Sequence, residues 1–237
     1  KQVKTDYWMW IDLDDEIGGV ENIRKVVDIM VENNLNEVWF EYDYHPQTKM
    51  SDYKAIQWRE RIIRTSSKQK WSNYAVHENI DAAGNTKEEF QTIVKVVHHK
   101  TTEQGQLAHE RNRRILEKDW KRAHTVPTAY YLGATYKHDG NYAGAIEKLM
   151  YVTKHDKGVG LRFLAWQNLF ECYFRTHKYI EALSATDKCI AHDPTHPASW
   201  YNKFAVYRAM NYYQSAMQAA EIALSKRVEE GSAILVG

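Results

Sequence analysis

An internal repeat in the C-terminal half of the sequence limits the folds that this chain can adopt. The same residue types recur at Tyr136, Tyr173 and Tyr207, at Ala145, Ala182 and Ala216, and at Trp166 and Trp200. The second and third copies lie 34 residues apart, whereas the first and second lie 37 apart, with an insertion near residues 157–160. A period of this length is typical of stacked helical units.

The repeated pattern resembles the tetratricopeptide repeat. The first copy keeps Leu132 and Gly133, and the second closes with Pro194. Each unit of that kind is a helix hairpin whose apolar face is covered only by its neighbour, so about three units are needed for stability. We therefore predict a connecting helix over residues 101–125, three repeats over 126–230 and a tail over 231–237.

Residues 1–100 follow a different pattern, in which short strand-like segments surround one helix. Buried or alternating apolar residues predict strands over 7–11, 37–44, 56–65 and 90–97, and helical spacing predicts a helix over 20–33. The segment 45–52 is expected to be a polar loop, and 71–80 to be irregular. The predicted fold class is an α/β sheet domain followed by an all-α array.

The first predicted strand ends in acidic residues, Asp12, Asp14, Asp15 and Glu16. Crowded carboxylates repel one another unless a cation lies between them, and a hard divalent ion is the usual partner. Open α/β sheets also bind ligands beyond the carboxyl ends of their strands. The pattern therefore predicts metal-assisted chemistry on a phosphate-bearing substrate.

Two other interpretations of the acidic residues remain. They could form a solvated turn that caps the following helix, because Asp and Glu favour helix N-termini. They also resemble the first motif of haloacid-dehalogenase-like phosphatases, but that motif requires Thr or Val where this chain has Glu16.

Later motifs follow in a fixed order. Residues 58–64 read WRERIIR, 70–71 read KW, 76–80 read VHENI, and 96–100 read VVHHK. With the acidic strand end, this set resembles the second half of a family 2 glycosyltransferase of GT-A fold, of the bacterial and phage type with appended tetratricopeptide repeats. The resemblance covers about residues 5–120 and the repeats. It implies inverting transfer of a sugar from a nucleotide sugar to a hydroxyl of a glycan or protein acceptor.

The resemblance also implies a metal site. Asp12 and Asp14 would hold Mn²⁺ or Mg²⁺ and the donor diphosphate, while Asp15 would support them or cap a helix. His98 or His99 would complete the site, and only one can reach it, because adjacent strand residues point to opposite faces. Register with the family favours His98. An imidazole ligand favours Mn²⁺ over Mg²⁺.

Three further residues receive roles from the same resemblance. Glu78 would be the general base that takes the proton of the acceptor hydroxyl. Trp71 would form a wall for a sugar ring, and Arg61 would contact phosphate. The alternatives are a helix-start carboxylate for Glu78, core packing for Trp71 and a salt-bridged strand face for Arg61 and Arg64.

Charge and composition bound the setting. The formal net charge of +1 gives no indication of nucleic acid or a membrane surface as a partner. No apolar run approaches the ~20 residues of a membrane span. Cys172 and Cys189 lie in apolar helical contexts and are expected to be core thiols in a reducing, cytoplasmic compartment.

Only eleven residues precede Asp12. The resemblance places nucleotide-binding strands before the acidic strand, so we expect an N-terminal half of the transferase domain to be supplied in the same polypeptide or by another chain. The alternative function is a non-catalytic repeat module, with a structural transferase remnant, that binds a protein partner or self-associates.

Overall fold

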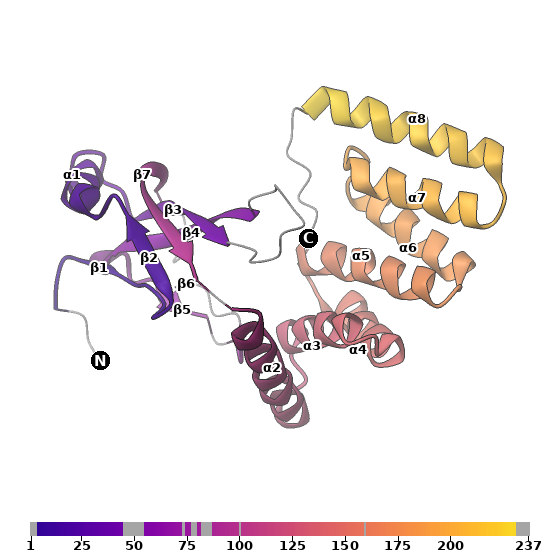
Figure 1. Ribbon diagram of the computed structural model, residues 1–237, viewed down its shortest axis with the longest axis horizontal. Helices are drawn as coiled ribbons and strands as arrows, with labels where there is room; N and C mark the ends of the chain where they lie inside the picture. Colours follow the sequence, from indigo (N-terminus) through magenta and orange to yellow (C-terminus); the bar gives the residue numbers. More distant parts are fainter. Residues whose placement is uncertain are drawn as a thin grey trace. The chain divides into compact units, whose positions relative to one another are not determined.

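The computed structural model describes residues 4–44, 55–72, 74–76, 80–81, 87–99, 101–158 and 160–230 (Figure 1). The chain divides into two compact units, Lys1–Arg111 and Asn112–Gly237. The first contains a mixed β-sheet and the second contains stacked helices. Helix α2 (Thr102–Arg122) corresponds to the predicted connecting helix, and the division falls within it.

The sheet unit is built on five strands within the described residues. They are β1 (Tyr7–Met9), β2 (Asp15–Gly18), β3 (Glu37–Tyr44), β4 (Ala55–Arg64) and β7 (Glu88–His98), in the order β1-β4-β3-β7-β2. Strands β3 and β7 are parallel, and the other neighbours are antiparallel. A separate short ladder pairs β5 (Lys70–Trp71) with β6 (Ile80–Asp81).

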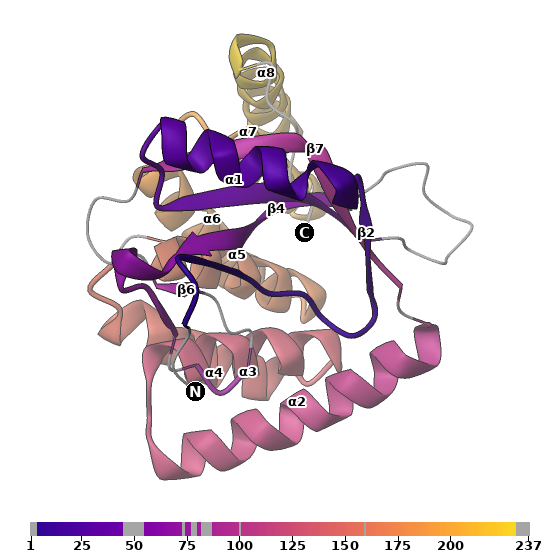
Figure 2. The same cartoon turned by 90° about the vertical axis from the view of Figure 1, so that its left-hand side faces the viewer.

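Helix α1 (Ile23–Glu32) covers one face of this sheet (Figure 2). Its Val26 and Met30, one turn apart, are fully buried in the same cluster as Val38 and Phe40, which alternate along β3. Full burial of each such side chain contributes about 1.5–3 kcal/mol. The apolar residues at helical spacing in the sequence are therefore those that pack α1 against the sheet.

Glycine and asparagine set the two ends of the α1 segment. Gly19 has φ 75°, and a Cβ there would lie 2.3 Å from the Ile93 carbonyl oxygen, so only glycine fits. A short 3₁₀ turn, η1 (Val20–Asn22), leads into α1, and Asn34 follows it with φ 53°.

The connection between β1 and β2 brings distant side chains together. These strands lie at opposite edges of the sheet, so residues 10–14 must pass across one of its ends. Arg61 of β4 lies 3.5 Å from Asp15 of β2, although two strands separate β4 from β2 in the order. The sheet is therefore curled, and this curl forms the candidate site.

The second unit is a tetratricopeptide-repeat-like array. It contains α3 (Val126–His138), α4 (Tyr142–His155), α5 (Gly160–Arg175), α6 (Tyr179–His192), α7 (Pro197–Ala209) and α8 (Tyr213–Glu230). Helices pack as the pairs α3–α4, α5–α6 and α7–α8, and α4 contacts α5 as α6 contacts α7. The predicted helix hairpins are thus confirmed.

The repeated residues form the core of the array. Ala145, Leu169 and Ala182 are fully buried. Gly133 permits close packing of α3 on α4, because a Cβ there would lie 2.8 Å from Cγ of Leu149. Cys172 and Cys189 are buried free thiols, as predicted, and burial raises their pKa values to about 11 and about 12.

The structure corrects several predicted elements. Strand β2 was not among the predicted strands, because residues 12–16 were interpreted as the acidic end of the first strand. The segment 71–80 contains ends of the β5–β6 ladder, whereas it was expected to be irregular. The predicted loop over 45–52 lies outside the described residues. Within the part of the chain that is described, no helix has both the length and the apolar character needed to cross a membrane.

Candidate functional site

A buried carboxylate, that of Asp15, is the centre of the candidate site. The Tyr42 hydroxyl donates a hydrogen bond to Asp15 Oδ1 (2.9 Å), and His98 Nδ1 lies 3.0 Å from the same oxygen. Oδ2 accepts from the Asp12 backbone N–H (3.0 Å) and lies 3.5 Å from Arg61 Nη2. The Asp15 side chain is 0% exposed. Asp15 is therefore saturated with partners inside the protein.

Of the two roles predicted for Asp15, the helix cap is wrong, whereas the contact of Asp15 with His98 fits the supporting role. Asp15 is the first residue of β2 and is paired in register with His98 of β7. The Asp15 N–H donates to the Asp12 carbonyl (3.1 Å), which closes a turn between β1 and β2. The acidic residues thus occupy a strand-to-strand turn, and this also excludes the capping interpretation for the whole run.

Asp14 and His98 form the accessible part of the site. His98 Nε2 lies 3.7 Å from Asp14 Oδ2, and the Asp14 side chain is 40% exposed. One ligand atom from each of Asp14, Asp15 and His98 lies within 4.8 Å of the others. An oxygen and nitrogen donor set of this kind suits Mn²⁺.

The contact between His98 Nδ1 and the Asp15 carboxylate explains how His98 is oriented. A histidine that binds a metal through one ring nitrogen usually engages a carboxylate or carbonyl through the other. Here Asp15 lies against Nδ1, so Nε2 is the nitrogen directed toward Asp14. These residues fit a cation held by Asp14 and His98, with Asp15 fixing the imidazole.

Asp12 and His99 lie apart from this cluster. Asp12 is exposed and meets Asp15 through its backbone N–H. His99 Nε2 lies 2.9 Å from Glu16 Oε2, with both side chains more than half exposed. The structure therefore groups the side chains of Asp14 and His98, and those of Asp12 and His99 lie outside this group. The backbone N–H of His99 donates to the Asp14 carbonyl (2.9 Å).

Arg61 is a buried structural cation, rather than an exposed phosphate ligand. Its guanidinium carbon lies 3.9 Å from the Trp10 ring centroid and 4.7 Å from that of Tyr42. Nη1 donates to the Trp10 carbonyl (3.3 Å), and the side chain is 1% exposed. Burial lowers the pKa of Arg61, and the negative charge of Asp15 opposes that shift.

Trp71 lies at the edge of the same assembly. Its ring is edge-on to Trp10 at 5.0 Å and tilted against Trp8 at 6.3 Å. The residue is 46% exposed, so part of the ring is accessible to a ligand. Glu78 and His77 lie outside the described residues.

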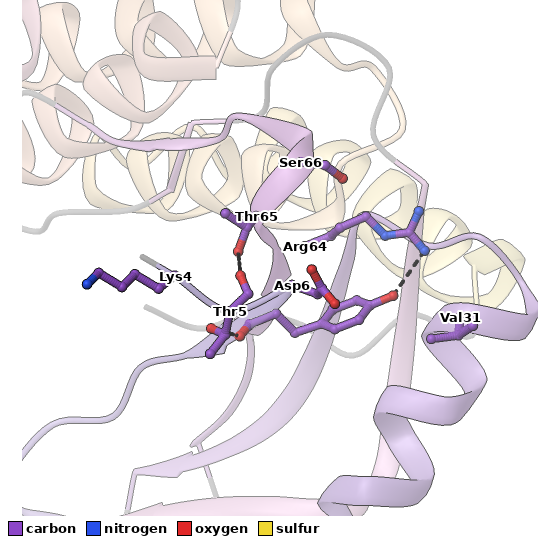
Figure 3. A pocket seen from close by; sticks show the side chains of 8 residues that line it. Lys4, Thr5, Asp6, Val31, Arg64, Thr65 and Ser66 are labelled. Atoms are coloured by element: carbon purple, nitrogen blue, oxygen red, sulfur yellow. Dashed lines mark hydrogen bonds between the residues drawn. The ribbon is translucent and has the colours of Figure 1, made fainter. Parts of the chain in front are cut away.

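Arg64 is the last residue of β4, and its side chain contacts β1 and α1. It donates to Asn34 Oδ1 (2.6 Å), to the Tyr7 hydroxyl (3.2 Å) and to the Met30 carbonyl (3.2 Å). Arg64 is one of the residues that line a hollow of about 540 Å³. Figure 3 shows these residues, among them Thr65, which donates to the Thr5 carbonyl (2.6 Å). These contacts tie β1 and α1 to β4 and agree with the structural interpretation of Arg64.

No protein-family model and no curated protein matches this chain. The solved structures that match this chain include several of MamA, of which three are described below. "MamA MSR-1 C2" is 19% identical and covers 54% of this chain and 72% of its own (TM-score 0.49). "Crystal structure of MamA" is 22% identical and covers 56% and 78% (TM-score 0.47). "MamA RS-1 ArsTM double mutant" is 15% identical and covers 54% and 71% (TM-score 0.49).

Proposed function

We propose that the repeat array binds a polypeptide partner. Stacked helix hairpins present a continuous surface made by the first helix of each pair, and such surfaces bind extended ligands. Helix α5 contacts both α3 and α7, so these first helices form one row. An ion pair between Lys137 of α3 and Glu171 of α5 links two of them.

The observation that carries this proposal is a pair of exposed apolar side chains in that row. Leu164 on α5 is 39% exposed, and Tyr201 on α7 is 61% exposed. Leu164 lies two residues before Trp166, and Tyr201 lies one residue after Trp200. In the frame of the repeat the two positions are three residues apart, which places both on the same side of their helices. Exposed aromatic and aliphatic side chains on the same side of neighbouring helices are suited to contact a partner.

A selection from a random peptide library displayed on phage tests this proposal. The purified chain is expected to enrich peptides whose affinity falls at least about tenfold on Tyr201→Ala, the loss expected when an aromatic anchor is truncated. Tyr213→Ala on α8 is the matched control, because Tyr213 is 66% exposed but lies on a second helix. Peptides that bind both variants as well as they bind the unchanged chain would contradict the proposal.

A second candidate function is metal-dependent glycosyl transfer, and one observation favours it. Asp14 and His98, to which the family resemblance gives metal-binding roles, lie together although they are distant in the sequence. A Mn²⁺ ion held there would act as a Lewis acid toward the leaving diphosphate. Trp71 would contact a sugar ring, and Glu78 would take the acceptor proton.

Release of nucleoside diphosphate from a panel of nucleotide sugars with Mn²⁺ tests this second function. The measurement uses the protein at its natural length. Both Asp14→Ala and Glu78→Gln are expected to reduce the rate at least about 100-fold, the lower range for a general base. The exposed Glu103→Gln serves as the control. Equal rates in all variants would exclude this site as the catalytic centre and leave peptide binding as the function.

A further inference from the structure

A cationic hollow lies between the first and second repeats, formed by α4, α5 and α6. It measures about 340 Å³ and is lined by Thr153, Arg162, Trp166, Lys188, Ala191 and His192. None of these lining residues is acidic. Lys188 and His192 are one helical turn apart on α6, so their side chains reach the same hollow.

The local contacts of Arg162 and Lys188 do not use up their capacity to bind an anion. Arg162 is anchored through Nη2, which donates to the Gly158 carbonyl (2.9 Å), while its buried Nε has no hydrogen-bond partner among the described residues. Lys188 is exposed. In the described part of the chain, no ion pair engages Lys188 or His192.

Two carboxylates close to the hollow have partners within the array. Asp156 accepts hydrogen bonds from the backbone N–H groups of Gly158 and Arg162, both at 2.9 Å. Asp187, next to Lys188, pairs with Lys203 of α7 (2.7 Å). The charge of Lys188 is therefore available to an external anion, whereas Arg162 has the charge of Asp156 close to its backbone.

We propose that this hollow binds carboxylate side chains from an acidic segment of a polypeptide partner. The planar guanidinium of Arg162 matches the geometry of a carboxylate, and Lys188 adds a second charge. Trp166 and Ala191 offer apolar surface to the methylene groups of a glutamate. This inference rests on the proposed peptide-binding function, and it adds a charge specificity at a surface separate from Tyr201.

Isothermal titration calorimetry with a hexaglutamate peptide tests the proposal. The unchanged chain is expected to bind hexaglutamate saturably, and more weakly as salt screens the charges. Lys188→Glu and Arg162→Gln are each expected to weaken binding at least about tenfold, or about 1.4 kcal/mol. Lys178→Glu makes the same charge change as Lys188→Glu at the other end of α6, and it should change affinity less than about twofold.

The outcomes separate this inference from the function on which it rests. Equal hexaglutamate binding by the unchanged chain, Lys188→Glu and Lys178→Glu, or no binding at all, would overturn the inference. So would inorganic phosphate binding as tightly as hexaglutamate, because the hollow would then be a general anion site. Loss of selected-peptide binding on Tyr201→Ala, with hexaglutamate binding independent of Lys188, would uphold the proposed function and overturn only the inference.

Discussion

Asp15→Ala is expected to lower the free energy of unfolding of the sheet unit by about 3–5 kcal/mol, the cost of leaving one partner of a buried ion pair without the other. Arg61 would remain buried between Trp10 and Tyr42, with its charge unpaired. Tyr42 and His98 would also lose the oxygen that they contact. Urea unfolding, monitored through the hydrogen exchange of the β2 and β7 amides, measures the change in the free energy of unfolding.

The neighbouring aspartate provides a matched control for that result. Asp14→Ala removes the same group one residue away, but the Asp14 side chain is 40% exposed. Its effect on stability should stay within about 0.5 kcal/mol, as for most surface substitutions. If both alanine variants unfold at the same urea concentration, Asp15 does not hold the sheet unit together as we describe.

For cation binding, Asp14 is expected to matter more than Asp15 as a direct ligand. Asp14→Ala and His98→Ala are each expected to weaken Mn²⁺ binding by about 100-fold or more, equivalent to about 2.7 kcal/mol. Each removes a donor atom, carboxylate oxygen or imidazole nitrogen, from the accessible side of the site. Titration of Mn²⁺ followed by electron paramagnetic resonance measures the affinity.

The second histidine controls for a general loss of imidazole. His99→Ala should leave Mn²⁺ affinity within about twofold of the unchanged chain, because His99 contacts Glu16 outside the cluster. Asp12→Ala should behave in the same way, since its side chain is exposed. A larger loss from His99→Ala than from His98→Ala would move the cation to the other face of β7.

Much of the fold was predictable because its elements have strong periodicity. The alternating aromatic residues predicted β3 over its observed bounds, Glu37–Tyr44, and helical spacing predicted α1 within a few residues. The repeat predicted the helix hairpins. Strand β2 (Asp15–Gly18) was not predictable in this way, because four residues are too few to show a period and β2 forms only by pairing with distant β7.

The candidate site was predictable only in part. Strand alternation indicated that only one of His98 and His99 could reach the metal site. The structure brings His98 to Asp14 and Asp15, and it brings His99 to Glu16. Asp15 was predicted either to support the metal-binding residues or to cap a helix. Its partners Tyr42 and Arg61 were not predicted, because they come from other strands and meet Asp15 only when the sheet curls. Asp12 was expected to be a ligand, but the turn between β1 and β2 leaves its side chain exposed.

We propose for the sheet unit that Asp14 and His98 hold a divalent cation, and locating the ion tests this claim most directly. Anomalous diffraction at the manganese absorption edge, on crystals of the chain soaked with Mn²⁺, gives the position of the metal. We expect one strong peak in contact with an Asp14 carboxylate oxygen and His98 Nε2, with Asp15 still bound to His98 Nδ1. A strong peak at other residues, or no peak at this cluster in ion-saturated crystals, would contradict the claim.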